Sequence, residues 1–255
     1  MLSNPLLTVL ALAFFPVVTT ALGAAIAAFR PPRAAIRSGI QHFAAGVVFS
    51  VVAVELLPDV VRVHDPIEIG WTFAAGVALM LVIERVGRRA EASAVAVAPT
   101  DGVATQGTLA SGPSVGQLVA IGIDVLIDGL LIGIALAAGD KEGLLLTAAL
   151  SLELLSLGLA MAAGLTASGA SRRRTILLPT AISLLLVVGA VIGETLLRGA
   201  SEHTLAGVLS FGSAALLYLV TEELLVDAHE SPDSTGATAM FFAGFLLFLL
   251  LGMAG

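Results

Sequence analysis

The chain has 255 residues, of which 58% are hydrophobic and only 12% are charged, and its mean hydropathy is +1.03. Soluble domains are about 45–50% apolar and about 25% charged, so this composition excludes a soluble globular fold and predicts a polytopic membrane protein. The formal net charge of −7 says little about the surface, because several acids lie inside apolar segments. The absence of cysteine excludes disulfides and thiolate metal sites.

Eight apolar segments follow one another along the chain and are predicted to cross a bilayer as helices. We place them at residues 6–29, 39–61, 67–86, 115–138, 142–166, 176–197, 204–226 and 238–253. This is an all-α integral membrane protein, with one transmembrane domain over residues 1–255. No basic region precedes the first segment, so we interpret it as a retained helix and not as a cleaved signal peptide. Residues 87–113, rich in Ala, Ser, Thr and Gly, predict a flexible loop.

The basic residues predict the orientation of these helices. Nine of the twelve Lys and Arg residues lie in the connections after the first, third and fifth helices, and the other three lie on the opposite side. Because positive residues gather on the cytoplasmic side, we expect these three connections in the cytoplasm and both termini outside it. The expected location is the cell (inner) membrane.

An internal repeat relates the two ends of the chain. Residues 42–59 align without gaps with residues 210–227, and residues 73–76 align in the same register with residues 241–244. The first three helices therefore resemble the last three, and the odd number of helices between them predicts opposite senses in the membrane. Inverted triplets around a central pair are typical of transporters with a site near the midplane. The alternative is chance agreement between helices rich in Ala, Leu and Gly.

Acidic residues lie in the middle of the two central helices. Asp124 and Asp128 are four residues apart and share one helix face, and Glu153 lies in the next helix. A carboxylate near the centre of a bilayer costs about 2.5–3.5 kcal/mol, so three of them require compensation. We predict a metal cation site formed by these three acids between the two helices. The alternatives are solvated or arginine-paired aspartates, and a protonated Glu153 within a packed helix pair.

Further polar residues are candidates for the pathway to this site. Gln117 shares the face of the two aspartates, and Ser156 lies one turn after Glu153, where small-residue packing is the simpler explanation. We interpret His42 as an interfacial or core histidine in preference to a metal ligand. Acids at the ends of the second and seventh helices would attract cations, although a solvated acidic loop would look the same. These acids are Glu55 and Asp59, and Glu222, Glu223 and Asp227.

The two central helices resemble those of the ZIP family of divalent metal transporters. The family's fourth helix carries His-Asn-x-x-(Asp/Glu)-Gly, and here Asp128-Gly129 matches the end of that motif, with Asp124 at the position of its histidine. In the motif of the fifth helix, Glu153 lies at the position of the first histidine and Gly158 at that of the glycine. Residues 43–59 and 217–225 are similar to the family's second and seventh helices.

This resemblance implies eight helices in a 3+2+3 inverted-repeat bundle, with a long cytoplasmic loop after the third helix. It also implies a homodimer in which the central helices slide against a scaffold, as in an elevator. The implied activity is transport of a divalent metal ion, such as zinc, iron or manganese, into the cytoplasm by alternating access. The transported metal ion and the lipid bilayer are the expected partners, and we expect no further cofactor and no nucleic acid.

The sequence departs from the family pattern at the metal ligands. Both motif histidines are absent, and the further acid positions of the fifth helix are Leu154 and Leu157. Carboxylates alone form a hard, oxygen-only site, which suits Mn²⁺, Mg²⁺, Ca²⁺ or Fe²⁺ better than a nitrogen-rich zinc site does. Zinc bound by oxygen stays open as an alternative.

Three alternative functions belong to other classes. The same acids would serve as a proton relay in a carrier of an organic solute, or as the remnant of a site in a metal sensor without transport. An intramembrane enzyme is disfavoured, because the helices contain no Ser/His or Asp/His pair, no His-Glu-x-x-His and no phosphate loop.

Metal uptake should weaken at acidic pH. Three carboxylates exceed the charge of one dication, titrate as a coupled set and bind metal in their deprotonated form, so protons compete with the metal. Initial rates of uptake from mildly acidic to mildly alkaline pH measure this effect. A flat profile would count against the carboxylate site.

Overall fold

The computed structural model describes residues 5–63, 65–96, 113–229 and 235–254, and for residues 5, 87–96, 227 and 229 it describes the backbone alone. Within these ranges the chain forms helices and no strand. Eight helices are long and apolar enough to cross a membrane, which confirms the expected number and a multi-pass membrane protein. They span Leu6–Phe29, Ala34–Arg62, Pro66–Val86, Val115–Ala138, Asp140–Ala167, Arg172–Leu197, Glu202–Leu224 and Thr235–Ala254.

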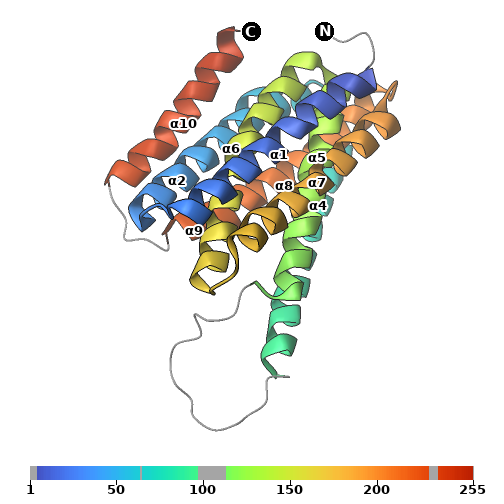
Figure 1. The fold of residues 1–255 in the computed structure, drawn as a ribbon. Coiled ribbons are helices and arrows are strands. Elements are labelled where there is room, and N and C mark those ends of the chain that lie inside the picture. Colours follow the sequence, from blue (N-terminus) through green and yellow to red (C-terminus); the bar gives the residue numbers. More distant parts are fainter. Residues whose placement is uncertain (1–4, 64, 97–112, 230–234, 255) are drawn as a thin grey trace.

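Two of the eight spans are divided into shorter elements by π-helical segments. In chain order the elements are α1 (Pro5–Phe29), α2 (Ala34–Val51), η1 (Val52–Leu56), α3 (Leu57–Arg62), α4 (Pro66–Ala96), α5 (Val115–Ala138), α6 (Asp140–Ala167), α7 (Arg172–Leu197), α8 (Glu202–Leu219), η2 (Val220–Leu224), α9 (Leu225–His229) and α10 (Thr235–Ala254). The first helix begins and the last helix ends at the same end of the bundle (Figure 1).

The third span is longer than its apolar segment. α4 continues to Ala96 and extends beyond the other helices (Figure 1), so the first part of the segment expected to be a flexible loop is helical. The alanines, arginines and glutamate of residues 87–96 are strong helix formers, which explains the continuation. The rest of that expected loop, residues 97–112, lies outside the described residues.

Serine caps explain why some helices begin before their apolar segments do. The Ser171 hydroxyl accepts a hydrogen bond from the Arg174 N–H at the start of α7, and Ser201 accepts one from Thr204 at the start of α8. A side-chain oxygen at this position satisfies a backbone N–H that has no partner within the helix. The polar first turn is therefore helical although its hydropathy gives no sign of it.

The helices pack in two groups. α1 packs along α6 and α7, and α5 packs along α7 and α6, so these elements form a four-helix group. In the flanking group, α2 packs along α10 and α4 along α8, together with the short elements η1, α3, η2 and α9. Contacts of α2 with α6, and of α4 with α5, join the two groups. The acids predicted to bind metal belong to the four-helix group.

The two halves of the internal repeat have matching secondary structure. When residues 42–59 are aligned with residues 210–227, the first and last residues of α2 coincide with those of α8, and those of η1 coincide with those of η2. Their helix contacts also match, because a Cβ on Gly76 would overlap the Phe211 carbonyl and a Cβ on Gly244 would overlap the equivalent Phe43 carbonyl. These correspondences support the repeat, and its inverted 3+2+3 arrangement stays a prediction.

Glycine brings α5 and α7 together backbone to backbone. A Cβ on Gly129 would overlap the Leu186 carbonyl, and a Cβ on Gly189 would overlap the Leu126 carbonyl. Close approach at small residues is a principal means of helix association in lipid. Lipid chains are as apolar as the helices, so no hydrophobic effect drives the helices together there. Because Gly129 directly follows Asp128, this crossing also fixes the backbone that carries the buried acids.

The substitution Gly129→Ala should destabilise the protein. Its new methyl group meets backbone of α7, which cannot rotate away, and overpacking of this kind costs about 1–3 kcal/mol. Thermal unfolding of the purified protein in detergent should show a lower Tm. Gly164→Ala is the matched control, because nothing lies within 4 Å of the position of its Cβ and helix propensity favours alanine. Equal Tm values for the two variants would contradict this account of the crossing.

Candidate metal centre

α5 and α6 bring together the three acids singled out in the sequence. One oxygen of each of Asp124, Asp128 and Glu153 lies within 4.8 Å of the others. The three residues are 9%, 2% and 4% exposed, so the cluster is shielded from the surface. Two oxygens bound to one ion lie at most twice the metal–oxygen distance apart, which is roughly 4–5 Å for Zn²⁺, Mn²⁺ or Ca²⁺. The three acids therefore fit around one divalent cation with little rearrangement.

The described residues supply no counter-charge to this centre. None of the described Lys and Arg residues forms an ion pair with the three acids, and Asp128 Oδ2 and Glu153 Oε2 have no hydrogen-bond partner in the described parts of the chain. Glu223 of η2 adds a further negative charge that repels all three. Buried like charges without partners are strongly unfavourable. The arrangement calls for a cation or for protons.

α1 holds the α6 side of the centre in place. A Cβ on Gly158 would overlap the Thr20 carbonyl, so α1 and α6 approach closely one turn beyond Glu153. The Thr19 hydroxyl donates a hydrogen bond of 2.8 Å to the Ser151 carbonyl, next to the same turn. The buried glutamate is therefore carried by backbone that is fixed on a neighbouring helix, as the aspartates are on α7.

Two of the candidate pathway residues lie apart from the cluster. Gln117 is exposed in the first turn of α5, where its N–H donates to the Ser114 hydroxyl that caps the helix. Ser156 is buried in α6, and neither residue belongs to the group of three acids. A role for them in a pathway stays a prediction.

His42 is buried in the middle of α2, one turn beyond Ser38, which contacts α9. Its Nδ1 lies 2.9 Å from the Ser38 carbonyl oxygen, and the Ser38 hydroxyl donates to the Ala228 carbonyl at 2.7 Å. The bond from Ser38 ties α2 to α9, and the burial of His42 with its contact inside α2 agrees with its interpretation as a core histidine. It is not part of the cluster of acids.

The acids of the flanking group have different environments. Glu55, in η1, is buried and forms an ion pair with Lys141 of α6, with 3.6 Å between Oε2 and Nζ. Asp59 of α3 pairs with Arg62 at 2.8 Å. At the other end of the bundle, Glu222 and Glu223 of η2 are exposed. The side chain of Asp227 lies outside the described residues.

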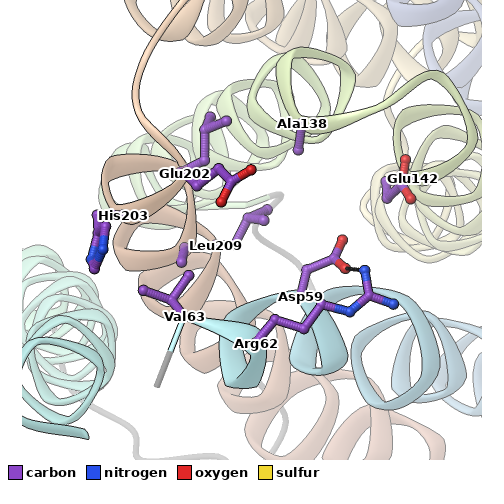
Figure 2. Close-up of a pocket in the computed structure, with 10 residues that line it drawn as sticks. Asp59, Arg62, Val63, Ala138, Glu142, Glu202, His203 and Leu209 are labelled. Carbon is purple, nitrogen blue, oxygen red and sulfur yellow. Dashed lines mark hydrogen bonds and ion pairs between the residues drawn. The ribbon is translucent and has the colours of Figure 1, made fainter. Parts of the chain in front are cut away.

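A separate cavity of about 430 Å³ lies at the end of the bundle where α5 and α6 connect. Asp59, Glu142 and Glu202 surround it, with the pair between Asp59 and Arg62 at one side (Figure 2). Leu209 of α8 completes its lining and is itself buried. Arg62 and His203 also line this cavity, and an entrance role for Asp59 stays a prediction.

Sequence reasoning missed contacts that join distant parts of the chain. Lys141 is one of the three basic residues predicted on the side opposite the cytoplasm, and the sequence suggests no further role for it. In the structure its Nζ donates to the Gly252 carbonyl at 2.7 Å. Tyr218 of α8 donates to Glu84 of α4 at 2.6 Å. Their signal in the sequence is weak: each is a polar residue near the end of an apolar segment, and nothing local indicates its partner.

Eight apolar helices around a buried carboxylate centre define a multi-pass membrane protein with a candidate cation site. No protein-family model matches the chain. It is 30% identical over 128 residues to a zinc transporter, GufA, from Myxococcus xanthus, which covers 50% of each chain. It is 29% identical over 132 residues to a zinc transporter, ZIPB, from Bordetella bronchiseptica, covering 51% of this chain and 42% of that protein.

The chain spans about half the length of the curated relatives it matches. Both matches support the resemblance to the ZIP family that the motifs indicated, as a distant relationship. Both relatives are named transporters, which agrees with the expectation that the chain is not an enzyme.

Neutralising Asp128 should have opposite effects on the metal-free and metal-loaded protein. Without metal, Asp128→Asn removes one of several buried like charges and should raise Tm. At a hundred times Kd, metal should stabilise the parent by about 2.7 kcal/mol and the variant far less. Thermal unfolding with and without Mn²⁺ or Zn²⁺ measures both effects.

The control for this experiment is Glu194→Gln, which removes a buried acid of the same helix group that has a cationic partner, Arg198, at 2.9 Å. Loss of that partner should lower Tm and leave the stabilisation by metal unchanged. A parent protein that no divalent metal stabilises would speak against the centre.

Proposed function

We propose that the chain is a ZIP-type divalent metal transporter, with Asp124, Asp128 and Glu153 as the ligands of the ion in transit. The observation that carries this proposal is a pair of buried carboxylate oxygens, on Asp128 and Glu153, that have no hydrogen-bond partner among the described residues. A membrane protein retains such groups where a passing cation compensates for them. The two relatives named zinc transporters support the same function.

The cargo we propose is a divalent ion that accepts an all-oxygen site. The described centre contains three carboxylates and neither histidine nor cysteine. An all-oxygen site suits Mn²⁺ and Fe²⁺ better than a nitrogen-rich zinc site does. Carboxylate oxygens still bind Zn²⁺, at about 2.0–2.2 Å. We therefore expect Mn²⁺, Fe²⁺ and Zn²⁺ to compete for one site, in contrast to a strictly zinc-selective protein.

The proposed route runs from the acidic cavity beside Asp59, through the three acids, to the exposed Glu222 and Glu223 at the other end. We propose that the four-helix group moves relative to the flanking group, so that the centre opens to one side at a time. Uptake into the cytoplasm, both termini outside it, an inner-membrane location and a homodimer are parts of this proposal. The tight packing within each group supports movement of the groups as units.

Transport by purified protein in liposomes tests the proposal. The parent should take up Mn²⁺ or Zn²⁺, and Asp128→Asn and Glu153→Gln should each reduce the initial rate by at least about tenfold, because loss of one charged ligand weakens a buried ion site by more than 1.4 kcal/mol. Glu194→Gln is the control that should keep its rate.

The rival functions give other outcomes in the same experiment. A carrier of another solute would show proton flux with that solute and no stimulation by metal. A sensor descended from a transporter would bind metal, as judged by thermal stabilisation, and would show no uptake for either the parent or the variants. Either result would overturn metal transport.

A further inference from the structure

Lys141 connects three elements at one end of the bundle. It lies in the first turn of α6, and its Nζ donates to the carbonyl of Gly252 in the last turn of α10. The same nitrogen pairs with Glu55 of η1, whose carboxylate lies directly against Gly252, because a Cβ on that glycine would overlap Glu55 Oε1. One ammonium group therefore holds a helix end and a buried acid at once.

The direction of the Lys141 side chain follows from charge. A cation is unfavourable at the N-terminus of its own helix and favourable at the C-terminus of another, where carbonyls lack partners within the helix. Glu55 adds a negative charge at the same point. The ammonium is thus drawn away from α6 and towards α10 and η1.

This contact crosses the boundary between the two helix groups. Lys141 belongs to the group that carries the three acids, whereas Glu55 and Gly252 belong to the flanking group. Three other long-range polar contacts among the described residues each stay within one group: Thr19 to Ser151, Ser210 to Ile69, and Tyr218 to Glu84. Any displacement of α6 along the flanking group has to break the bonds of Lys141.

The equivalent position at the other end of the bundle is in a different state. The internal repeat aligns Glu55 of η1 with Glu223 of η2. Glu55 is buried and paired with Lys141, whereas Glu223 is exposed. The two ends of the bundle therefore differ: at one of them the acid of the π-helical segment is held by a cation from the other helix group.

We infer that the Lys141 ammonium is a releasable latch, which holds this end of the pathway closed by joining α6 to Glu55 and Gly252. The inference rests on the proposed alternating access and adds the residue that controls one of its two gates. Lys141 is 41% exposed and its ion pair is long, so water competes for both bonds. A weak contact of this kind is suited to break and re-form in every cycle.

A single engineered thiol reports whether the latch is closed. The chain has no cysteine, so Ala206→Cys is unique, and this buried position lines the cavity at the same end. The rate of reaction with an uncharged maleimide is measured on purified protein in nanodiscs, where both faces are accessible. Lys141→Gln should raise that rate by about fivefold, as expected for loss of an ion pair at the upper end of its usual strength.

Three matched variants separate a latch from a structural effect. Lys141→Arg keeps a donor and a positive charge and should label at the parent rate. Arg62→Gln removes a cation from the same cavity, but its partner Asp59 lies in the same helix, so the rate should not change. Exchanging the charges, with Glu55→Lys and Lys141→Glu together, should restore slow labelling.

Two results would overturn the latch: labelling of Lys141→Gln at the parent rate, or equal acceleration by Arg62→Gln. If Lys141→Gln fails to fold, Glu55→Gln takes its place, since it removes the charge and keeps the acceptor for Lys141. Labelling requires no metal flux, so its outcome is independent of the liposome experiment. A protein that transports metal while its labelling is insensitive to Lys141 would keep the proposed function and lose the latch.

Discussion

Three carboxylates packed between apolar helices are the constraint on which the rest of this molecule depends. Each costs about 2.5–3.5 kcal/mol to insert at the bilayer centre, and a folded protein has a net stability of only about 5–15 kcal/mol. The backbone contacts of α5 with α7 and of α1 with α6 supply packing on both sides of the acids. Close backbone packing thus coincides with the least favourable charges, as expected for a site selected for binding and not for stability.

The polar contacts divide the molecule into stiff and yielding parts. Hydrogen bonds such as Tyr218 to Glu84 fasten helices within the flanking group, and Thr19 to Ser151 does the same in the four-helix group. Between the groups, the described side chains meet largely through apolar surfaces, which slide without leaving donors unsatisfied. The half-exposed Lys141 is placed across that boundary. Polar bonds inside the groups and apolar contact between them is the arrangement that the proposed movement of the groups requires.

The amino-acid sequence was sufficient for the eight spans and for the shared face of Asp124 and Asp128, because hydropathy and helical spacing are local properties. Their meeting with Glu153 was predicted from the need of buried carboxylates for compensation, which is not a local pattern. It was insufficient wherever a partner is remote. The bond from Lys141 to Gly252 depends on where α10 packs, and no local pattern specifies that. The extension of α4 to Ala96 was missed because residues 87–96, which favour helix, were interpreted as part of a flexible loop. The π-helical segments have no composition that distinguishes them from the α-helix on either side.

Those segments have a consequence for how such a protein changes over time. A π-helical turn holds one residue more than an α-helical turn, so everything beyond it is rotated by roughly 100° relative to an uninterrupted helix of the same sequence. Deleting a single residue from η1 or η2 would restore regular winding and leave α3 or α9 presenting the same side to its neighbours, because the wider turn accommodates the extra residue. A one-residue insertion or deletion at this point thus changes only the local winding, so a lineage can gain or lose either π-helical segment while the side chains beyond it keep their contacts.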